Sequence, residues 1–107
     1  MISPGALRHR LTLQEVQRVS DGAGGFTTSW EDVADVWARL TPVGGSEGVE
    51  AGRLAGKRAF EIVLRYRDGV QPAMRFVSGA RIFEILTAAT IGERRHWLRC
   101  LCEERDL

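Results

Sequence analysis

The chain has 107 residues, 44% of them apolar, which is enough for one compact domain with a modest core and excludes a wholly disordered polymer. Fifteen basic and fourteen acidic residues give a net charge of +1, so the composition as a whole does not favour nucleic acid or anionic lipid as a partner. No apolar run is long enough to cross a membrane, and the start MISPGALRHR lacks the apolar core of a signal peptide, so a cytoplasmic origin without a membrane partner is expected.

The first predicted element is a β-hairpin. In residues 10–19, RLTLQEVQRV, apolar and polar side chains alternate and then change phase, which predicts a strand with a bulge near Gln14 and Glu15. The stretch SDGAGG at 20–25 predicts a turn, and FTTSWEDV at 26–33 returns as the second, half-exposed strand. One face of that strand is expected to carry Phe26, Thr28 and Trp30.

Period-two alternation continues through the rest of the chain, while helical periodicity hardly appears. The clearest example is FEIVLRY at 60–66, which predicts a core strand. Pro42 is expected to end the strand before it, because proline cannot donate a hydrogen bond to a ladder. The further predicted strands are residues 35–43, 73–77, 81–87 and 96–104. The fold class is therefore predicted as mainly β, a small antiparallel β-barrel of six to seven strands in a single domain, 1–107.

The two cysteines, Cys100 and Cys102, lie one residue apart in LRCLCEE. On a strand this spacing points both thiols to the same face without letting them bridge each other easily, so small buried core residues are expected rather than a disulfide. A metal site would need further ligands such as His9 and His96, and neither stands at a recognised zinc spacing. The sequence therefore predicts no metal.

The sequence shows no recognisable set of catalytic residues. His9 and His96 each lie near arginines in strand-like runs, whereas a nucleophilic triad needs a histidine between an activated hydroxyl or thiol and a carboxylate. The acidic doublets at 31–32 and 103–104 place neighbouring carboxylates on opposite faces of a strand, so they do not form a shared acid/base site. No catalytic residue and no cofactor are predicted, and the protein is expected not to be an enzyme.

The segment 44–57, GGSEGVEAGRLAGK, separates two predicted strands and has a glycine at every fourth position, namely Gly44, Gly48, Gly52 and Gly56. Its end resembles a phosphate-binding P-loop, but Ala51 stands where the first glycine is required and Arg58 where a magnesium-binding hydroxyl is required. A strand follows, whereas a P-loop leads into a helix whose N-terminus holds phosphate. A nucleotide site is therefore not expected.

The same segment gives mixed helical signals. A capping residue, early acidic residues and late basic residues suit the helix dipole, and these are Ser46, Glu47, Glu50, Arg53 and Lys57. Three interior glycines oppose a helix by about 1 kcal/mol each, and only Val49 and Leu54 supply apolar anchoring. A flexible surface loop and a segment that orders in an assembly both stay open, so the prediction is an inserted loop or short helix at about 44–57.

The order of these features resembles the head-tail joining proteins, also called head-closure or stopper proteins, of long-tailed phages and gene transfer agents. The most specific pieces are D-G-x-G-G-x-x-x-x-W at 21–30, V-W-A at 36–38 and P-x-x-G-x-E at 42–47. Weaker agreement comes from GALRHRLTLQ, FEIVLRYRDGV, RIFEIL and LRCLCEE, so the match runs nearly end to end. The resemblance implies a structural virion protein of the head-tail connector, present in the host cytoplasm during assembly and at the head-tail junction of the finished particle.

The resemblance also implies partners: a homo-oligomeric ring, either a hexamer or a dodecamer; the adaptor or portal side of the head; the tail terminator or tail tube; and packaged double-stranded DNA, which the ring helps to retain and gate. Members of the family carry a long excursion at the position of 44–57, where subunits and neighbouring rings meet. By analogy, the ring interface would include Ser46, Glu47, Val49, Glu50, Arg53, Leu54 and Lys57, and the DNA channel would be contacted by Arg53, Lys57 and Arg58. A near-neutral charge agrees with DNA that must slide.

Three alternatives stay open. The nearest is another connector or tail component, such as an adaptor or tail terminator, which shares most of these expectations. A small β-barrel nucleic-acid-binding module would need exposed aromatic residues interleaved with basic ones on one sheet face, and the aromatic residues are expected to fall mostly on apolar faces. A small hydrolase would need a catalytic constellation that the sequence does not display.

Overall fold

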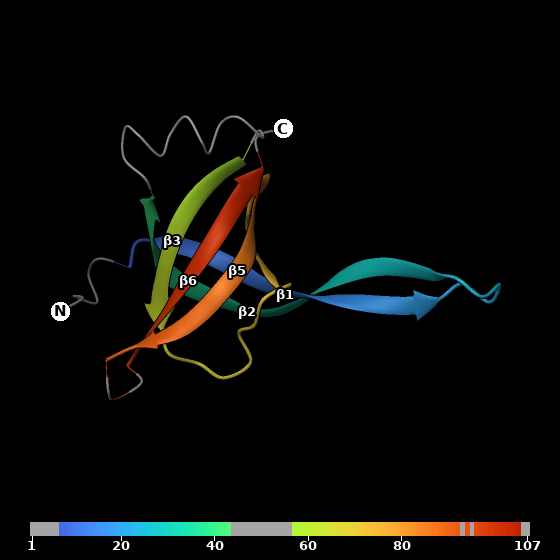
Figure 1. Ribbon diagram of the computed structural model, residues 1–107, viewed down its shortest axis with the longest axis horizontal. Coiled ribbons are helices and arrows are strands. Elements are labelled where there is room, and N and C mark those ends of the chain that lie inside the picture. The colour runs from blue at the N-terminus through green and yellow to red at the C-terminus, as the bar shows by residue number, and fades with distance from the viewer. Residues whose placement is uncertain (1–6, 44–56, 93, 95, 106–107) are drawn as a thin grey trace.

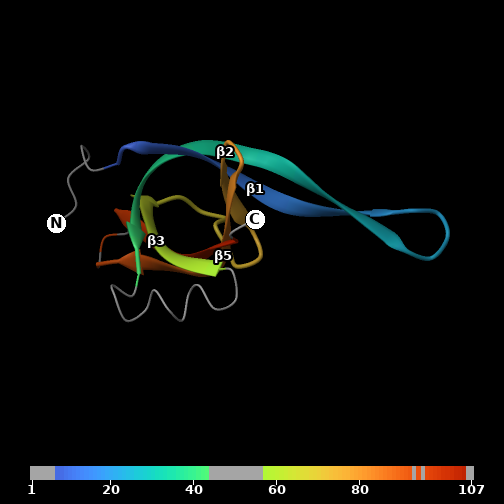
Figure 2. The ribbon, with the colours of Figure 1, turned by 90° about the horizontal axis from the view of Figure 1, so that it is seen from above.

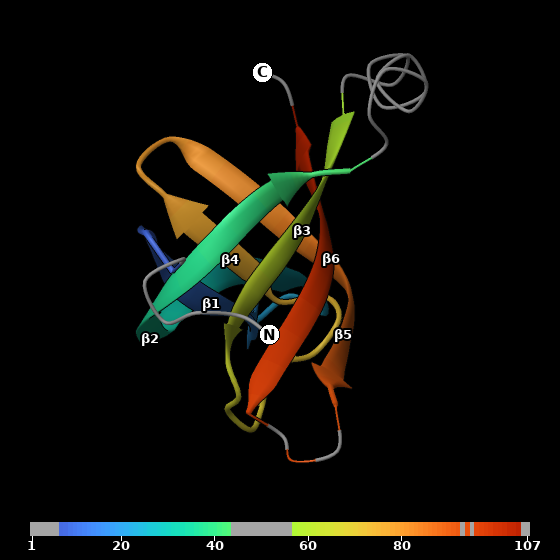
Figure 3. The ribbon, with the colours of Figure 1, turned by 90° about the vertical axis from the view of Figure 1, so that its left-hand side faces the viewer.

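Six antiparallel strands make up most of what a computed structural model of the chain describes, which is residues 7–43, 57–92, 94 and 96–105. They are β1 (His9–Ser20), β2 (Phe26–Pro42), β3 (Lys57–Arg65), β4 (Arg75–Ser78), β5 (Arg81–Ile91) and β6 (Trp97–Arg105). The strands pair in the order β1-β2-β3-β6-β5-β4, and β4 pairs again with β1, so the sheet closes into a barrel (Figures 1 and 3). The predicted fold class is confirmed, with six strands.

The strand β2 is continuous, where the sequence predicted one strand ending at Val33 and another beginning at Asp35. Its pairing with β1 shifts between Leu13 and Gln14, which leaves Val33 as the extra residue of a β-bulge. The predicted bulge therefore lies where it was expected, but its extra residue belongs to β2. The insertion changes the phase of the side chains without ending the ladder, so the sequence pattern resembles two strands.

The core lies inside the barrel and takes alternate residues from all six strands. Its buried members are Leu11, Leu13, Ala38, Phe60, Ile62, Leu64, Met74, Phe76, Phe83, Ile85, Leu98, Cys100 and Cys102. Phe60 and Phe83 meet edge to face, with ring centroids 5.4 Å apart. Both cysteines are free and buried, as their spacing on one strand predicted.

Half of the β1–β2 hairpin extends beyond the barrel (Figures 1 and 2). The neighbouring strand β4 pairs with residues 12–14 of β1, and β3 pairs with residues 38–42 of β2. Farther along the hairpin, among the described strands, residues 15–20 and 26–31 pair with each other alone. We call residues 15–31 the arm. The predicted hairpin is confirmed, but its projection away from the barrel was not predicted.

A glycine-rich turn closes the tip of the arm at the position that the sequence predicted. Gly22 and Gly24 have φ values of 80° and 85°, a conformation that glycine adopts without strain. The carboxylate of Asp21 accepts hydrogen bonds from the backbone N–H groups of Ala23 and Gly25, at 2.8 and 3.0 Å. These two bonds stabilise the charged form and lower the pKa of Asp21. The tip is thus held by local hydrogen bonds.

The other connections follow the sequence pattern where the structure describes them. Residues 67–72 form the expected loop between β3 and β4, and Gly79, with a φ of 59°, lies in the tight turn between β4 and β5. The insertion predicted at 44–57 lies outside the described residues, except that Lys57 begins β3. Within the described part of the chain there is no helix with the length and hydropathy that a membrane span requires.

Candidate functional site

Most of the predicted interface residues lie outside the part of the chain that the structure describes. They are Ser46, Glu47, Val49, Glu50, Arg53 and Leu54. The backbone of Lys57 pairs with Arg105 at the start of β3. Arg58 follows it and is exposed. Of the three predicted DNA contacts, the structure therefore places the side chain of Arg58 alone.

Arg58 lies in a basic rim at the end of the barrel where β3 begins. It lines a depression of about 260 Å³ with Arg81, Glu104 and Arg105. Arg81 donates two hydrogen bonds to the carboxylate of Glu104, from Nε at 2.6 Å and from Nη2 at 3.0 Å, and this pairing raises the pKa of Arg81. Glu104 thus neutralises Arg81, and Nε of Arg105 lies 3.6 Å from the carboxylate of Glu84, so Arg58 is the rim arginine without an ion pair in the described chain.

The residues considered for catalysis or metal binding are divided between the surface and the core of the described chain. His9 and His96 are exposed. Cys100 and Cys102 lie in the core, where burial raises the pKa of Cys100 to about 12 and also raises the pKa of Cys102. Both thiols are therefore protonated at neutral pH. No three His, Cys, Asp or Glu residues of the described chain gather closely enough to hold a metal ion.

The two faces of the arm differ in charge. In an antiparallel ribbon, directly opposed residues share a face. Glu15 opposes Glu31, and Gln17 opposes Ser29, so these residues share one face, which we call the acidic face of the arm. The Nε2 group of Gln17 donates to the carboxylates of Glu15 and Glu31, at 3.4 and 3.1 Å. The acidic face also carries Val19, which is 53% exposed.

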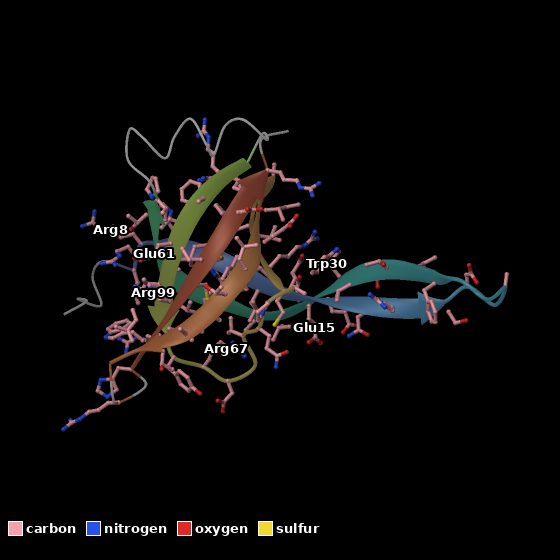
Figure 4. The ribbon with its side chains drawn as sticks, viewed as in Figure 1. Arg8, Glu15, Trp30, Glu61, Arg67 and Arg99 are labelled. Atoms are coloured by element: carbon pink, nitrogen blue, oxygen red, sulfur yellow. The ribbon has the colours of Figure 1, made fainter. Side chains whose placement is uncertain are left out.

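The other face of the arm holds the residues that fix it to the barrel. Trp30 opposes Val16, and the guanidinium of Arg75 from β4 lies 3.9 Å from the centroid of the Trp30 ring. Nε of Arg75 donates to Gln14 at 2.8 Å, and Gln14 donates to Asp32 at 2.8 Å. These contacts join β4 to both strands at the root of the arm, where Figure 4 shows Trp30.

Phe26, Thr28 and Trp30 share this second face, as the sequence predicted. Two aromatic side chains depart from the expectation that these residues fall mostly on apolar faces. Phe26 is 70% exposed near the tip of the arm, and Trp37 is 56% exposed on the barrel. Alternation locates the face of a strand but does not show whether another element covers that face, and nothing described covers these two rings.

A basic surface lies on the outside of β2, β3 and β6. Arg39 of β2 and Arg99 of β6 share one carboxylate, Glu61 of β3, at 3.5 and 3.8 Å. Arg65 of β3 lies over the ring of Trp97, 5.6 Å from its centroid. We call this surface, together with the exposed side chains of Trp37 and Leu101, the basic face. Figure 4 shows Glu61 and Arg99 on the side of the barrel away from the arm.

Sequence reasoning did not find the acidic face or the basic face. The basic face draws its cations from three strands that are distant in the sequence, so only the pairing of β2 with β3 and of β3 with β6 brings them together. A signal was present in the alternation, which places Arg39, Arg65 and Arg99 on the outward side of their strands. The acidic face required the register of the hairpin beyond the bulge.

The sequence of residues 2–105 matches the model of a family described as phage head completion protein. The chain belongs to this family. Membership makes it a structural component of a phage-type virion and confirms the resemblance seen in the sequence. A comparison with curated proteins finds no match.

Two solved structures share the fold over nearly the whole length of the chain. One is a chain in the virion of a native gene transfer agent particle, with 35% identity and a TM-score of 0.75, covering 94% of this chain and 97% of that one. The other is the solution structure of protein SF1141 from Shigella flexneri 2a, with 27% identity and a TM-score of 0.70, covering 96% of each chain. The barrel and its projecting hairpin thus belong to a fold found in a virion.

Proposed function

We propose that copies of this protein form a ring at the head-tail junction, which closes the DNA-filled head, receives the tail and helps to retain the packaged DNA. The match of residues 2–105 to the head completion family carries this proposal. The 35% identity to a chain of a gene transfer agent virion supports it. The closed sheet also supports it, because a barrel without free edges presents defined outer surfaces for specific contacts instead of open edges for aggregation.

We also propose that the protein acts as one domain, 1–107, whose segment 44–57 meets neighbouring subunits or rings. The basic residues Arg53, Lys57 and Arg58 would then face DNA phosphates. The exposure of Arg58 in the basic rim beside Arg105 supports that role. The nearly balanced total charge supports a channel in which DNA slides, since a strongly basic lining would hold it.

Electron microscopy of particles made without the protein tests the proposal. Full-length protein supplied in trans is the matched control and restores joined particles. Without the protein, we expect heads and tails to separate and the encapsidated DNA to become sensitive to nuclease. Joined particles of normal appearance would contradict the proposal.

The same particles separate a stopper from its nearest alternatives. A stopper acts on the DNA as well as on the tail, so its loss releases DNA from heads. If the tailless heads keep their DNA fully protected from nuclease, the protein joins the tail at a later step, as a tail terminator would. Purified protein that binds single-stranded DNA tightly and in a salt-dependent manner would favour a nucleic-acid-binding module instead.

A further inference from the structure

The charge of the chain is divided between the arm and the rest. Residues 15–31 contain one basic residue, Arg18, and three acidic ones, which gives the arm a net charge of −2. The remaining residues contain fourteen basic and eleven acidic ones, which gives them a net charge of +3. The near-neutral total therefore hides two regions of opposite sign.

The acidic face of the arm holds two carboxylates close together. Glu15 and Glu31 are exposed and directly opposed across the ribbon, and like charges in this position destabilise a hairpin. Their hydrogen bonds from Gln17 supply dipoles but no positive charge. Neither carboxylate forms an ion pair with a described arginine. A cationic surface from outside the molecule would remove the repulsion.

The basic face has the complementary excess. Two guanidinium groups, those of Arg39 and Arg99, share the single carboxylate of Glu61 at distances beyond ordinary hydrogen bonds. The Nε atom of Arg39 is buried and finds no hydrogen-bond partner in the described structure. Leu101 and Trp37 add exposed apolar area beside these cations. The surface therefore combines unsatisfied positive charge with apolar contact area, as interfaces do.

The acidic face and the basic face lie on different sides of the molecule. Figures 1 and 2 show the arm leaving the barrel on the side away from β3. Each copy therefore carries an acidic face and a basic face that cannot contact each other within the same chain. Contacts of this heterologous kind join copies head to tail, and they close into a ring when the rotation allows.

We infer that the acidic face of the arm binds the basic face of a second copy of this chain. The inference deepens the proposed ring and rests on it. The arm is long enough to cross the basic face: six residues of β1 in the arm extend about 20 Å, and the three strands of the basic face span about 10 to 15 Å. Glu15 and Glu31 would approach Arg39 and Arg99, while Val19 would contact the apolar part of the face.

Photo-crosslinking in assembled particles tests which molecule the acidic face touches. A benzophenone amino acid at Ser29 lies on the acidic face, and the same amino acid at Thr28 lies on the opposite face of the same strand. From Ser29 we expect crosslinks to a second copy, mapped by mass spectrometry to peptides of β3 or β6. From Thr28 we expect at least about tenfold less of this product. Crosslinks from Ser29 only to a different protein or to DNA, or none to a second copy, would overturn the inference.

A charge exchange tests the contact in function. We expect Glu31→Lys and Arg99→Glu each to reduce joined particles by at least about tenfold, because like charges across an interface oppose binding. The double variant E31K/R99E restores the pair with reversed signs and is expected to recover most of the loss. Thr28→Lys, which adds a positive charge to the other face of the arm, is expected to leave the yield within about twofold.

The outcomes distinguish this inference from the function on which it rests. Circular dichroism of each purified variant shows whether it folds, and E31K should fold readily because it removes a like-charge pair. If folded E31K and R99E both assemble normally while particles without the protein fail to join, the arm contact is wrong and the proposed function stands. If deletion of the protein has no effect on joining, the proposed function itself is wrong. Loss in both single variants without recovery in the double variant also overturns the arm contact.

Discussion

The barrel and the arm are built from the same two strands, yet they satisfy their apolar side chains and backbone groups in different ways. In the barrel, β1 has a pairing partner on each side and points Leu11 and Leu13 into a closed core. In the arm, β1 pairs with β2 alone and leaves Val19 and Phe26 exposed. An isolated two-stranded ribbon is marginally stable in water. The barrel therefore supplies most of the packing of the fold, whereas the arm leaves apolar side chains exposed.

The two regions arise from a difference in strand length. β4 has four residues and covers only a short part of β1, so β1 and β2 outrun the barrel that they help to close. The bulge at Val33 lies at this point, where it bends and twists the ribbon. Arg75, stacked on Trp30, fixes the direction in which the arm leaves. A rigid root with an exposed end suits a contact with a neighbouring subunit.

The largest expected effect comes from truncating a phenylalanine in the barrel and comparing it with one in the arm. Phe83 is fully buried and packs against Phe60, so Phe83→Ala should lower the free energy of unfolding by about 3 to 5 kcal/mol. Phe26→Ala removes the same atoms from an exposed site and should change it by no more than about 0.5 kcal/mol. Urea denaturation followed by tryptophan fluorescence measures both.

A second substitution keeps this comparison informative when Phe83→Ala does not fold. Phe83→Leu retains most of the apolar volume and should cost about 1.5 kcal/mol. Equal losses from Phe83→Leu and from Phe26→Leu would show that the arm is packed against the barrel in solution. That result would remove the distinction between the two regions.

The next effect concerns the pH dependence that the two core thiols give to the barrel. The folded-state pKa of Cys100 is about 12 against an ordinary value of 9.0, so the folded protein holds its proton where the unfolded chain loses it. The contribution of the protonated Cys100 thiol to the stability of the folded state is complete below pH 9 and is lost as the pH rises toward 12. The free energy of unfolding should therefore fall by about 1.4 kcal/mol per pH unit above 9 for each such thiol. Urea denaturation between pH 8 and 10.5 measures the slope.

The double variant C100A/C102A separates the thiols from other groups that titrate in this range. It should be less stable at pH 8 but show a shallower decline above pH 9. An equal slope in both proteins would mean that the thiols are not buried as the barrel requires. A cysteine placed on the arm by Ser29→Cys should react with iodoacetamide at pH 8, whereas Cys100 and Cys102 should stay unreactive.

The sequence predicted the barrel strands well because two local signals mark a half-buried strand: alternation of apolar and polar residues, and turn residues at its end. The stretch 60–66 alternates and is followed by a predicted loop at 67–72, and its residues 60–65 lie in β3 (Lys57–Arg65), with Phe60, Ile62 and Leu64 in the core. Such local patterns depend on neighbouring residues only. The closure of the barrel could not be predicted in the same way, because the pairing of β1 with β4 joins residues more than sixty positions apart, such as Gln14 and Arg75.

The arm and the basic face could not be predicted from the sequence for a related reason, because both depend on how distant strands pair. Whether Phe26 is covered depends on how far β3 and β4 extend along the hairpin, and periodicity contains no information on that length. The positive charge of the basic face depends on Arg39 and Arg99 meeting at Glu61 across three strands. The interface and DNA-contact roles predicted for residues 44–57 stay a hypothesis, since these residues lie outside the described part of the chain apart from Lys57.

The smallest expected effect is a local loosening of the arm at its root. Arg75→Leu keeps an aliphatic side chain but removes the cation above Trp30 and the hydrogen bond to Gln14, which together should contribute about 1 kcal/mol. Because residues 15–20 and 26–31 pair only with each other in the described structure, the loss should appear as faster hydrogen exchange of their amides, while amides of β3 and β6 change little. Arg18→Leu, a matched change on the exposed part of the arm, should leave exchange nearly unaltered. Exchange that rises equally in β3 and β6 would show that Arg75 stabilises the whole barrel and that the arm is not an independent unit.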